Sequence, residues 1–276
     1  MIRVELVKLL RRPRTWVAVA LLCALPVLVA AFVAVRHLAP APGRGPAFMS
    51  AVLNNGSLYP AAAMAMVVPI FLPIAVAVLA GDAVAGEATG GTLRYLLARP
   101  VGRTRLLVAK LVALTVFVLL ALAAVVGTSY VAGVLLLGTQ PPAALGEPGG
   151  VTSLSGPPLT STQLTLRVLG TVAFITVSML GVAAIALFLS TLTDSALGAA
   201  FGALAVLVTS DVLLTLDAAS AVQPYLPTRY WLAWVDFFRD PIFWRDIEHG
   251  LLLQACYLGL LLGAAWANFM TRDVTS

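Results

Sequence analysis

Six long apolar runs constrain the fold of this chain more than any other feature. They cover about residues 16–35, 60–80, 106–138, 166–192, 196–216 and 251–270. Each is close to or above the ~20 residues that an α-helix needs to cross the hydrocarbon core of a bilayer. Charged residues make up only 11% of the chain, against about 25% in a typical soluble domain. The sequence therefore predicts an all-α polytopic membrane protein with six transmembrane helices.

The basic residues divide unequally between the two sides that six crossings define. One side would hold the termini and the loop between the second and third runs, with Arg3, Lys8, Arg11, Arg12, Arg14, Arg94, Arg99, Arg103, Arg105, Lys110 and Arg272. The other side would hold Arg36, Arg44, Arg167, Arg229, Arg239 and Arg245. Because loops rich in Lys and Arg stay in the cytoplasm, we expect a multi-pass protein of the cell membrane with both termini cytoplasmic.

Residues 1–14 predict an amphipathic helix. One face carries apolar side chains, namely Ile2, Leu6, Leu9 and Leu10, and the other carries Lys8, Arg11 and Arg12. A helix of this kind lies in the headgroup plane and is attracted to anionic lipid. A plain basic flank that only sets orientation is the compatible alternative. The first apolar run lacks a small-residue cleavage site, so we expect it to be a retained span.

The loop between the second and third runs predicts a second short helix. Gly90 and Gly91 end the preceding helix, and Thr92 can cap a new one. Leu93, Leu96 and Leu97 then share one helical face, before Pro100 and Gly102 end the helix. The acids Asp82 and Glu87 could pair with Arg94, Arg99 or a neighbouring basic group. We therefore expect an amphipathic helix whose apolar face needs a partner.

This loop resembles the signature of the permease subunits of ABC transporters of the type-2 exporter (ABC-2) family. The matching residues are Glu87, Gly91, Thr92, Leu93, Leu96, Leu97, Pro100 and Arg103, followed by Lys110 at the start of the next span. The resemblance implies one permease domain over residues 1–276, with an elbow helix at 1–14. It also implies that residues 88–101 form a coupling loop, whose helix from Thr92 to Ala98 docks on a separate ATPase subunit. An ordinary loop helix that only obeys the positive-inside rule is the alternative.

The resemblance further implies an assembly of two ABC ATPase subunits and a second permease, identical or paralogous. In the family the first and fifth spans form the interface between permeases. Gly198 and Gly202 match this expectation, because small residues four apart let two helices approach closely. Packing within the chain is the competing interpretation of the same pattern.

The connection from 217 to 250 combines dense aromatic residues with mixed charge, which is typical of interfacial helices. Pro241 divides it, so we expect two short helices. The resemblance implies re-entrant helices that form an outer gate, with Trp231, Trp234 and Phe238 as candidates. Binding of an external protein is the competing use of these aromatics. We interpret His249 as an interfacial residue rather than a metal ligand.

Two features inside the apolar runs leave alternatives open. Asp211 is the one acid well inside a run, where a charge at the bilayer centre costs about 2.5–3.5 kcal/mol and less toward an end. It could line a translocation path or pair with Arg229 or Arg239. Pro69 and Pro73 should bend the second span, either as a lever or as a static kink.

The sequence lacks the usual catalytic and metal-binding motifs. It has no P-loop, no H-E-x-x-H and no G-x-S-x-G, and its two Cys lie in separate runs. The sequence shows no folded domain with a continuous basic face, so we do not expect nucleic-acid binding. We therefore expect no enzyme, metal site or cofactor in this chain, with ATP and Mg²⁺ bound by the partner ATPase.

These observations support one main hypothesis and one alternative. The first is the permease subunit of an ATP-driven exporter that moves an apolar or amphipathic substrate, such as a drug or a lipid, out of the cytoplasm. The second is a non-transport membrane partner of ABC ATPases that gives a mechanical or signalling output. Spans almost free of charge favour an apolar or amphipathic substrate.

Overall fold

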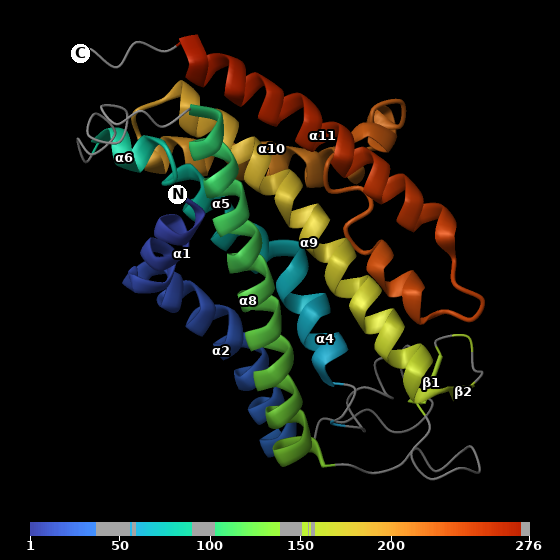
Figure 1. The fold of residues 1–276 in the computed structure, drawn as a ribbon. Helices are drawn as coiled ribbons and strands as arrows, with labels where there is room; N and C mark the ends of the chain where they lie inside the picture. Colours follow the sequence, from blue (N-terminus) through green and yellow to red (C-terminus); the bar gives the residue numbers. More distant parts are fainter. Residues whose placement is uncertain are drawn as a thin grey trace.

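The computed structural model describes residues 1–36, 56, 59–89, 103–138, 151–153, 155 and 158–271. This part of the chain is mostly helical, and its strands form one short antiparallel pair, β1 (Val151–Thr152) with β2 (Pro158–Leu159). Within it, six helical segments are long and apolar enough to cross a membrane (Figure 1). The predicted fold class is therefore confirmed.

The six segments follow the chain in order. They are α2 (Pro13–Arg36), a composite of α4 (Tyr59–Met66), η2 (Val67–Phe71) and α5 (Leu72–Gly81), then α8 (Arg103–Leu137), α9 (Ser161–Leu192), α10 (Ala196–Leu214) and α11 (Trp244–Thr271). Shorter elements are α1 (Ile2–Arg11), α6 (Ala85–Thr89) and three 3₁₀ turns, η3 (Asp217–Ala219), η4 (Gln223–Tyr225) and η5 (Ala233–Phe238).

The last helix begins at Trp244, earlier than the predicted start at Leu251. Its first turns keep one side in the core, because Ile247 and Gly250 are buried while Arg245 and Glu248 are exposed. Arg245 and Glu248, two of the charged residues that suggested a separate interfacial segment, therefore occupy the outward face of a continuous helix.

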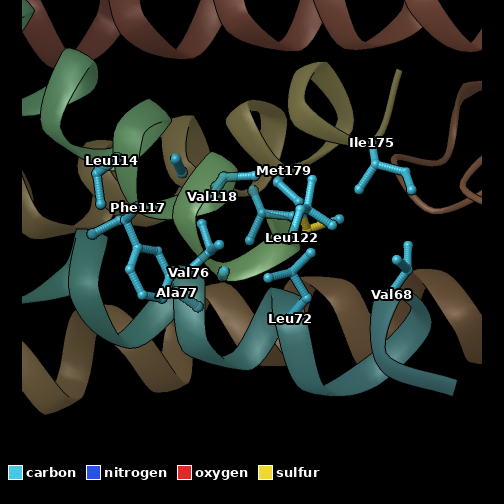
Figure 2. Close-up of a cluster of buried hydrophobic side chains, with 14 of the residues drawn as sticks. Val68, Leu72, Val76, Ala77, Leu114, Phe117, Val118, Leu122, Ile175 and Met179 are labelled. Atoms are coloured by element: carbon cyan, nitrogen blue, oxygen red, sulfur yellow. The ribbon is translucent and has the colours of Figure 1, made fainter. Parts of the chain in front are cut away.

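The core lies where α5, α8 and α9 meet (Figure 2). From α5 it receives side chains at helical spacing, such as Leu72 and Val76, which are almost fully buried. Phe117 of α8 and Met179 of α9 pack against them and are also fully buried. One face of α5 is thus committed to the centre of the bundle.

The prolines of the second span produce a π-helical turn, η2, rather than a simple kink. Pro73 has no N–H to donate to the carbonyl of Pro69 four residues earlier. The helix widens at this point, and the N–H of Leu72 bonds to the carbonyl oxygen of Val67, five residues back. Turns of this kind occur mostly as local insertions in α-helices, frequently at functional sites.

Gly81 marks the closest approach of α5 to α10. A Cβ atom added at Gly81 would lie 2.8 Å from the backbone nitrogen of Ala200 and 3.1 Å from the carbonyl oxygen of Ala196. Both neighbours are backbone atoms, which cannot move aside cheaply. The approach therefore depends on the absence of a side chain at this position.

We predict that Gly81→Ala lowers the melting temperature of the detergent-solubilised protein, because overpacking costs about 1–3 kcal/mol. Gly127→Ala in α8 is the matched control, since nothing lies within 4 Å of its added Cβ. That variant should keep or raise the melting temperature, because Ala favours helix. Equal melting temperatures for the two variants would contradict the assigned α5–α10 contact.

Candidate functional site

The helix α1, the start of α2, the helix α6 and the start of α8 lie together at one end of the bundle, here called the basic end (Figure 1). The amphipathic helix predicted at the N-terminus is present as α1. Its residues Glu5 and Leu9 face inward and are buried, whereas Ile2 and Leu10 are exposed. Only part of the predicted apolar face therefore packs against the rest of the chain.

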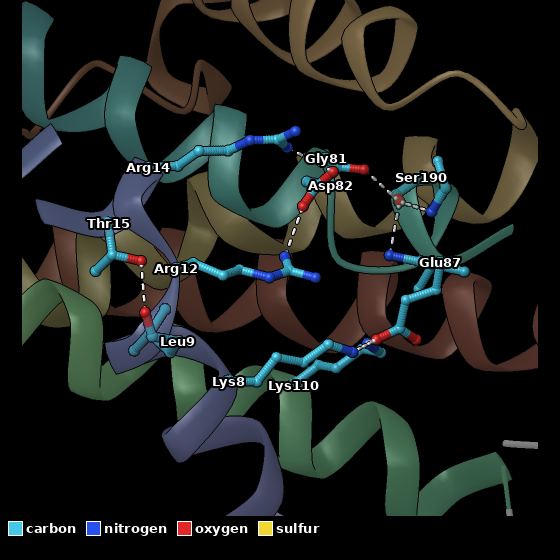
Figure 3. A network of polar contacts seen from close by, with 12 residues as sticks. Lys8, Leu9, Arg12, Arg14, Thr15, Gly81, Asp82, Glu87, Lys110 and Ser190 are labelled. Carbon is cyan, nitrogen blue, oxygen red and sulfur yellow. Dashed lines mark hydrogen bonds and ion pairs between the residues drawn. The ribbon is translucent and has the colours of Figure 1, made fainter. Parts of the chain in front are cut away.

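A buried ionic cluster joins α1, α6 and α8 at this end (Figure 3). The Nζ of Lys110 lies 2.8 Å from Oε1 of Glu87, and Lys8 donates to the same oxygen. Lys110 also lies 3.6 Å from Oε2 of Glu5. The side chains of Glu87 and Lys110 are each only 3% exposed, so this pair is shielded from solvent. We call these four residues, Glu5, Lys8, Glu87 and Lys110, the ionic cluster.

Two opposing effects set the pKa of the Glu87 carboxyl. Burial raises the pKa, because it disfavours the charged form. Lys110 and Lys8 lower it through their positive charges and hydrogen bonds, and their combined effect is the larger. The pKa of Glu87 therefore lies below the ordinary value of 4.5, and the carboxylate stays charged near neutral pH.

A second ionic contact links the end of α5 to the junction between α1 and α2. The carboxylate of Asp82 accepts from Arg12 at 2.6 Å and from Arg14 at 3.2 Å. From the sequence we expected Asp82 and Glu87 to pair with Arg94, Arg99 or a neighbouring basic group. Arg94 and Arg99 lie outside the described residues. The partners observed here come from the N-terminal helices and α8, which are far away in sequence.

Ser190 near the end of α9 is a site residue that the sequence analysis missed. Its buried hydroxyl donates to the carbonyl oxygen of Gly81 at 2.7 Å and accepts from the N–H groups of Ala85 at 2.9 Å and Val84 at 3.2 Å (Figure 3). It thereby holds the turn between α5 and α6, just before Glu87. A lone serine in an apolar run carries no motif, and its position at the end of a span was the only signal.

The last helix is tied to the same end of the bundle. Asn268 of α11 donates to the carbonyl oxygen of Thr191 at 2.8 Å, and Trp266 donates to the hydroxyl of Thr104 at 2.9 Å. Polar contacts thus connect α11 to both α9 and α8 at the level of the ionic cluster.

The predicted coupling helix falls largely outside the described residues. This applies to Gly91, Thr92, Leu93, Leu96, Leu97 and Pro100, and for Arg103 only the backbone at the start of α8 is described. Of the predicted coupling residues, Glu87 alone has a described side chain, and it lies in the ionic cluster. The coupling helix itself stays a prediction.

The two glycines proposed for a permease interface differ in surroundings. An added Cβ at Gly202 would lie 3.0 Å from Cδ1 of Leu189 in α9, so this glycine packs within the chain. Gly198 is exposed, and its described neighbours are Ser195 and Thr193 in the preceding turn. The interface roles of Gly198 and Gly202 stay predictions, and the contact of α10 with Gly81 of α5 uses Ala196 and Ala200.

The prediction of two short helices between 217 and 250 is wrong. The first part forms three short 3₁₀ turns, of which η5 packs onto α9 and α11 and η3 contacts α10, and the second part belongs to α11. Trp231 and Trp234 are buried in the core, and Phe238 packs against Trp234 in a T-shaped contact.

Hydrogen bonds hold the segment between α10 and α11 in place. The hydroxyls of Ser210 and Thr228 lie 2.7 Å apart, and Gln254 donates to the carbonyl oxygen of Pro227 at 2.7 Å. Both contacts are buried, and they fasten the segment to α10 and to α11.

Asp211 is exposed near the outer end of α10 and has no ion pair within the described part of the chain. The alternative that it pairs with Arg229 or Arg239 is therefore wrong for this structure. Arg239 instead pairs with Asp236 at 2.6 Å. An acid so close to a helix end can reach the headgroup region, which lowers its cost. Its role in a translocation path stays a prediction.

Burial raises the pKa of Asp236, and the charge of Asp246 adds to this effect. The positive charge and hydrogen bond of Arg239 partly offset the rise. Across the described residues, no group of three or more His, Cys, Asp or Glu side chains is arranged to hold a metal ion.

Six helical segments of membrane-crossing length and composition, with a buried ionic cluster at the basic end, define an integral membrane protein. Comparison with protein families gives a match over residues 1–205 to the family described as ABC-2 family transporter protein. The chain belongs to this family, whose members form the membrane component of ABC transporters and generally partner with ABC ATPase subunits. The comparison with curated proteins finds no match.

We predict that Glu87→Gln destabilises the protein in a pH-dependent way. Because the folded pKa lies below 4.5, the carboxylate contributes its stability fully above that pH and loses it as the pH falls through the folded pKa. Breaking a buried ion pair costs about 3–5 kcal/mol. The difference in melting temperature between wild type and Glu87→Gln should be largest near neutral pH and shrink below about pH 4.5.

Thermal unfolding in detergent from about pH 7 to about pH 3.5 measures this difference. Glu248→Gln, at an exposed position of α11, is the matched control and should track the wild type. A difference between wild type and Glu87→Gln that stays constant across the range would contradict the assigned charge state.

We predict that Ser190→Ala loosens the turn between α5 and α6. Three backbone groups lose their hydrogen bond to the Ser190 hydroxyl, and each such bond contributes about 0.5–1.5 kcal/mol. The peptide containing Val84 and Ala85 should exchange its amide hydrogens faster, as measured by mass spectrometry. Ser178→Ala is the control, because that hydroxyl bonds only to Phe174 of its own helix. Unchanged exchange in Ser190→Ala would show that the hydroxyl does not hold the turn.

Proposed function

We propose that this chain is the permease subunit of an ATP-driven exporter. The ionic cluster transmits the motion of the ATPase to the membrane-spanning helices. The observation that carries this proposal is the buried pair of Glu87 and Lys110. These residues flank the predicted coupling helix, one in α6 before it and one in α8 after it. The pair therefore joins the two ends of the segment that would contact the ATPase.

The ionic cluster explains how movement of the coupling helix would reach the membrane-spanning helices. Glu87 follows α5 by only a few residues, and Lys110 lies in the second turn of α8. Lys8 adds α1 to the same group. Because these elements are fastened together, movement of the coupling helix would displace α1, α5 and α8 as one unit. The π-turn η2 is then a natural place for the second span to bend.

The energy would come from a different polypeptide. ATP and Mg²⁺ would bind the two ATPase subunits, and no cofactor is assigned to this chain. The excess of Lys and Arg at the basic end supports a cytoplasmic location for that end, because basic loops remain on the cytoplasmic side. The ATPases would then dock from the cytoplasm against a protein of the cell membrane.

A second permease would complete the assembly. The helices α2 and α10 expose large apolar side chains along much of their length, including Leu21, Leu28, Phe32, Leu197, Phe201 and Val208. These surfaces suit contact with another permease as well as contact with lipid. Their position on the first and fifth spans agrees with the interface expected from the family resemblance.

The cargo would be apolar or amphipathic and would leave the cytoplasm between the two permeases. The competing function, a mechanical or signalling output through the outer aromatic segment, is less well supported. Trp231 and Trp234 are buried in the chain's own core, which leaves them unable to bind an external protein without rearrangement.

We predict that Leu93→Asp combined with Leu96→Asp abolishes stimulation of the ATPase on co-assembly. Both leucines lie on the predicted apolar face of the coupling helix, and a charge there would have to be buried in the docking groove. ATP hydrolysis by the purified complex in proteoliposomes, with and without transport, is the measurement. The pair Leu93→Met and Leu96→Met is the matched control, because methionine keeps the apolar volume.

The Asp variant should retain the six-span fold, so its melting temperature should stay close to that of the Met control. If the Asp variant still assembles with the ATPase and shows coupled turnover, the docking proposal is wrong. ATP hydrolysis without any flux in the wild type would instead favour the non-transport alternative.

A further inference from the structure

An apolar groove opens between α2 and α5 beside the basic end. Its volume is about 550 Å³, within the range of about 300–1,000 Å³ typical of ligand sites. It lies on the face of α5 that points away from the core, where Phe71, Ile74 and Val78 are exposed. The lining residues are Pro13, Arg14, Val17, Ala18, Leu21, Leu22, Phe71, Ile74, Ala75, Val78 and Leu79. We call this feature the α2–α5 groove.

Small side chains create the groove. Ala18 of α2 and Ala75 of α5 lie between larger apolar neighbours, so their methyl groups leave space that a Leu or Phe would fill. Leu22 and Leu79 are almost fully buried, whereas Leu21 is two-thirds exposed. The groove is therefore open to the surroundings of the bundle and lined by hydrocarbon.

The length of the groove matches one leaflet of a bilayer. It runs from Arg14 to Leu22 along α2, which at 1.5 Å per residue is about 12 Å. The stretch from Phe71 to Leu79 covers a similar length of α5, starting from the π-turn η2. One leaflet contributes about 15 Å of hydrocarbon, half of the ~30 Å core. An acyl chain that enters from the basic end would thus reach along the groove.

One arginine lies at the mouth of the groove, next to the acids Asp82 and Asp194 of the adjoining cleft. Arg14 is the only charged residue in its lining, and the side chain of Arg14 is 69% exposed. Arg12 and Arg14 share the single carboxylate of Asp82, which leaves one net positive charge among these three groups. Arg14 uses one of its five N–H donors for this contact, and a guanidinium can bind phosphate through two parallel hydrogen bonds.

A wider cleft of about 1,070 Å³ adjoins the mouth and shares Arg14 and Val78 with the groove. Its other polar lining residues are Asp82, Thr193, Asp194 and Ser195. The cleft offers space beside Arg14 for the polar part of an amphipathic molecule, while the groove offers an apolar surface for its tail.

We propose that the α2–α5 groove binds a phospholipid from the leaflet next to the basic end. One acyl chain lies in the groove, and the phosphate pairs with Arg14. The ligand is an intact phospholipid rather than a soluble anion, because ten of the eleven lining residues are apolar or nearly so and only the mouth is charged. This inference does not depend on the proposed export function.

Native mass spectrometry of the delipidated protein tests the proposal. Dioleoyl phosphatidylglycerol is titrated against dioleoylglycerol, which has the same acyl chains and no phosphate. The wild type should retain one phosphatidylglycerol in preference to the diacylglycerol. Arg14→Gln should weaken phosphatidylglycerol binding about tenfold or more, because it removes the charged donor. Arg12 still pairs with Asp82 in that variant, so the fold should be retained.

Two further variants separate the contribution of general positive charge from that of the space in the groove. Arg105→Gln removes an exposed basic residue at the start of α8, outside the groove, and should bind phosphatidylglycerol like the wild type. Ala18→Phe combined with Ala75→Phe fills the groove and should lose the bound lipid. Its melting temperature shows whether the filled protein is folded, and Arg14→Gln remains a separate test if it is not.

Three outcomes would overturn the proposal. Equal binding of phosphatidylglycerol by wild type and Arg14→Gln would show that the phosphate does not pair with Arg14. An equal loss of phosphatidylglycerol binding in Arg105→Gln would show that binding depends on general positive charge and not on a contact with Arg14. A change in the number of chains on filling the groove, with lipid binding unaltered, would identify a second copy of the chain as the occupant, and the same spectra report that number.

Discussion

The organisation of this protein depends on the pairing of charged side chains that are buried next to a hydrocarbon core. Buried charges are stable only when they are paired and hydrogen-bonded. The pair of Glu87 and Lys110 meets this condition because Lys8 and Glu5 surround it from α1. The requirement draws three segments, α1, α6 and α8, to one place, since none of these charges could remain there alone. The N-terminal helix is therefore held in the fold by pairing as well as by its apolar face.

The apolar contacts have a different role, because they determine which faces are internal. The core side of α5 packs against α8 and α9, and Gly81 brings its end into backbone contact with α10. The opposite side of α5 stays open beside α2, where alanines leave a groove. One helix thus presents a packed face to the bundle and a hollow face to its surroundings. In a membrane, both faces can be apolar, so hydrophobicity alone does not distinguish them.

This limit explains what the sequence could and could not predict. Membrane-length apolar runs predicted six spans, and the spacing of Leu9 and Lys8 predicted an amphipathic α1. The partners of Glu87 could not be predicted, because pairing over long sequence separations leaves no local pattern. Ser190 was missed for the same reason. The outer segment was misread because aromatic side chains such as Trp234 suit an interface and a core equally well.

The ionic contacts and the groove meet at the pair of Arg14 and Asp82. Asp82 lies one residue after Gly81, and Ser190 holds the turn that follows. A phosphate at Arg14 would share the guanidinium with Asp82, while Arg12 would keep Asp82 paired. Lipid at the groove would therefore change the contacts at the end of α5 without opening the ionic cluster around Glu87. Because a ligand shifts an equilibrium only through contacts that differ between states, this shared arginine is where lipid could influence the base of the coupling segment.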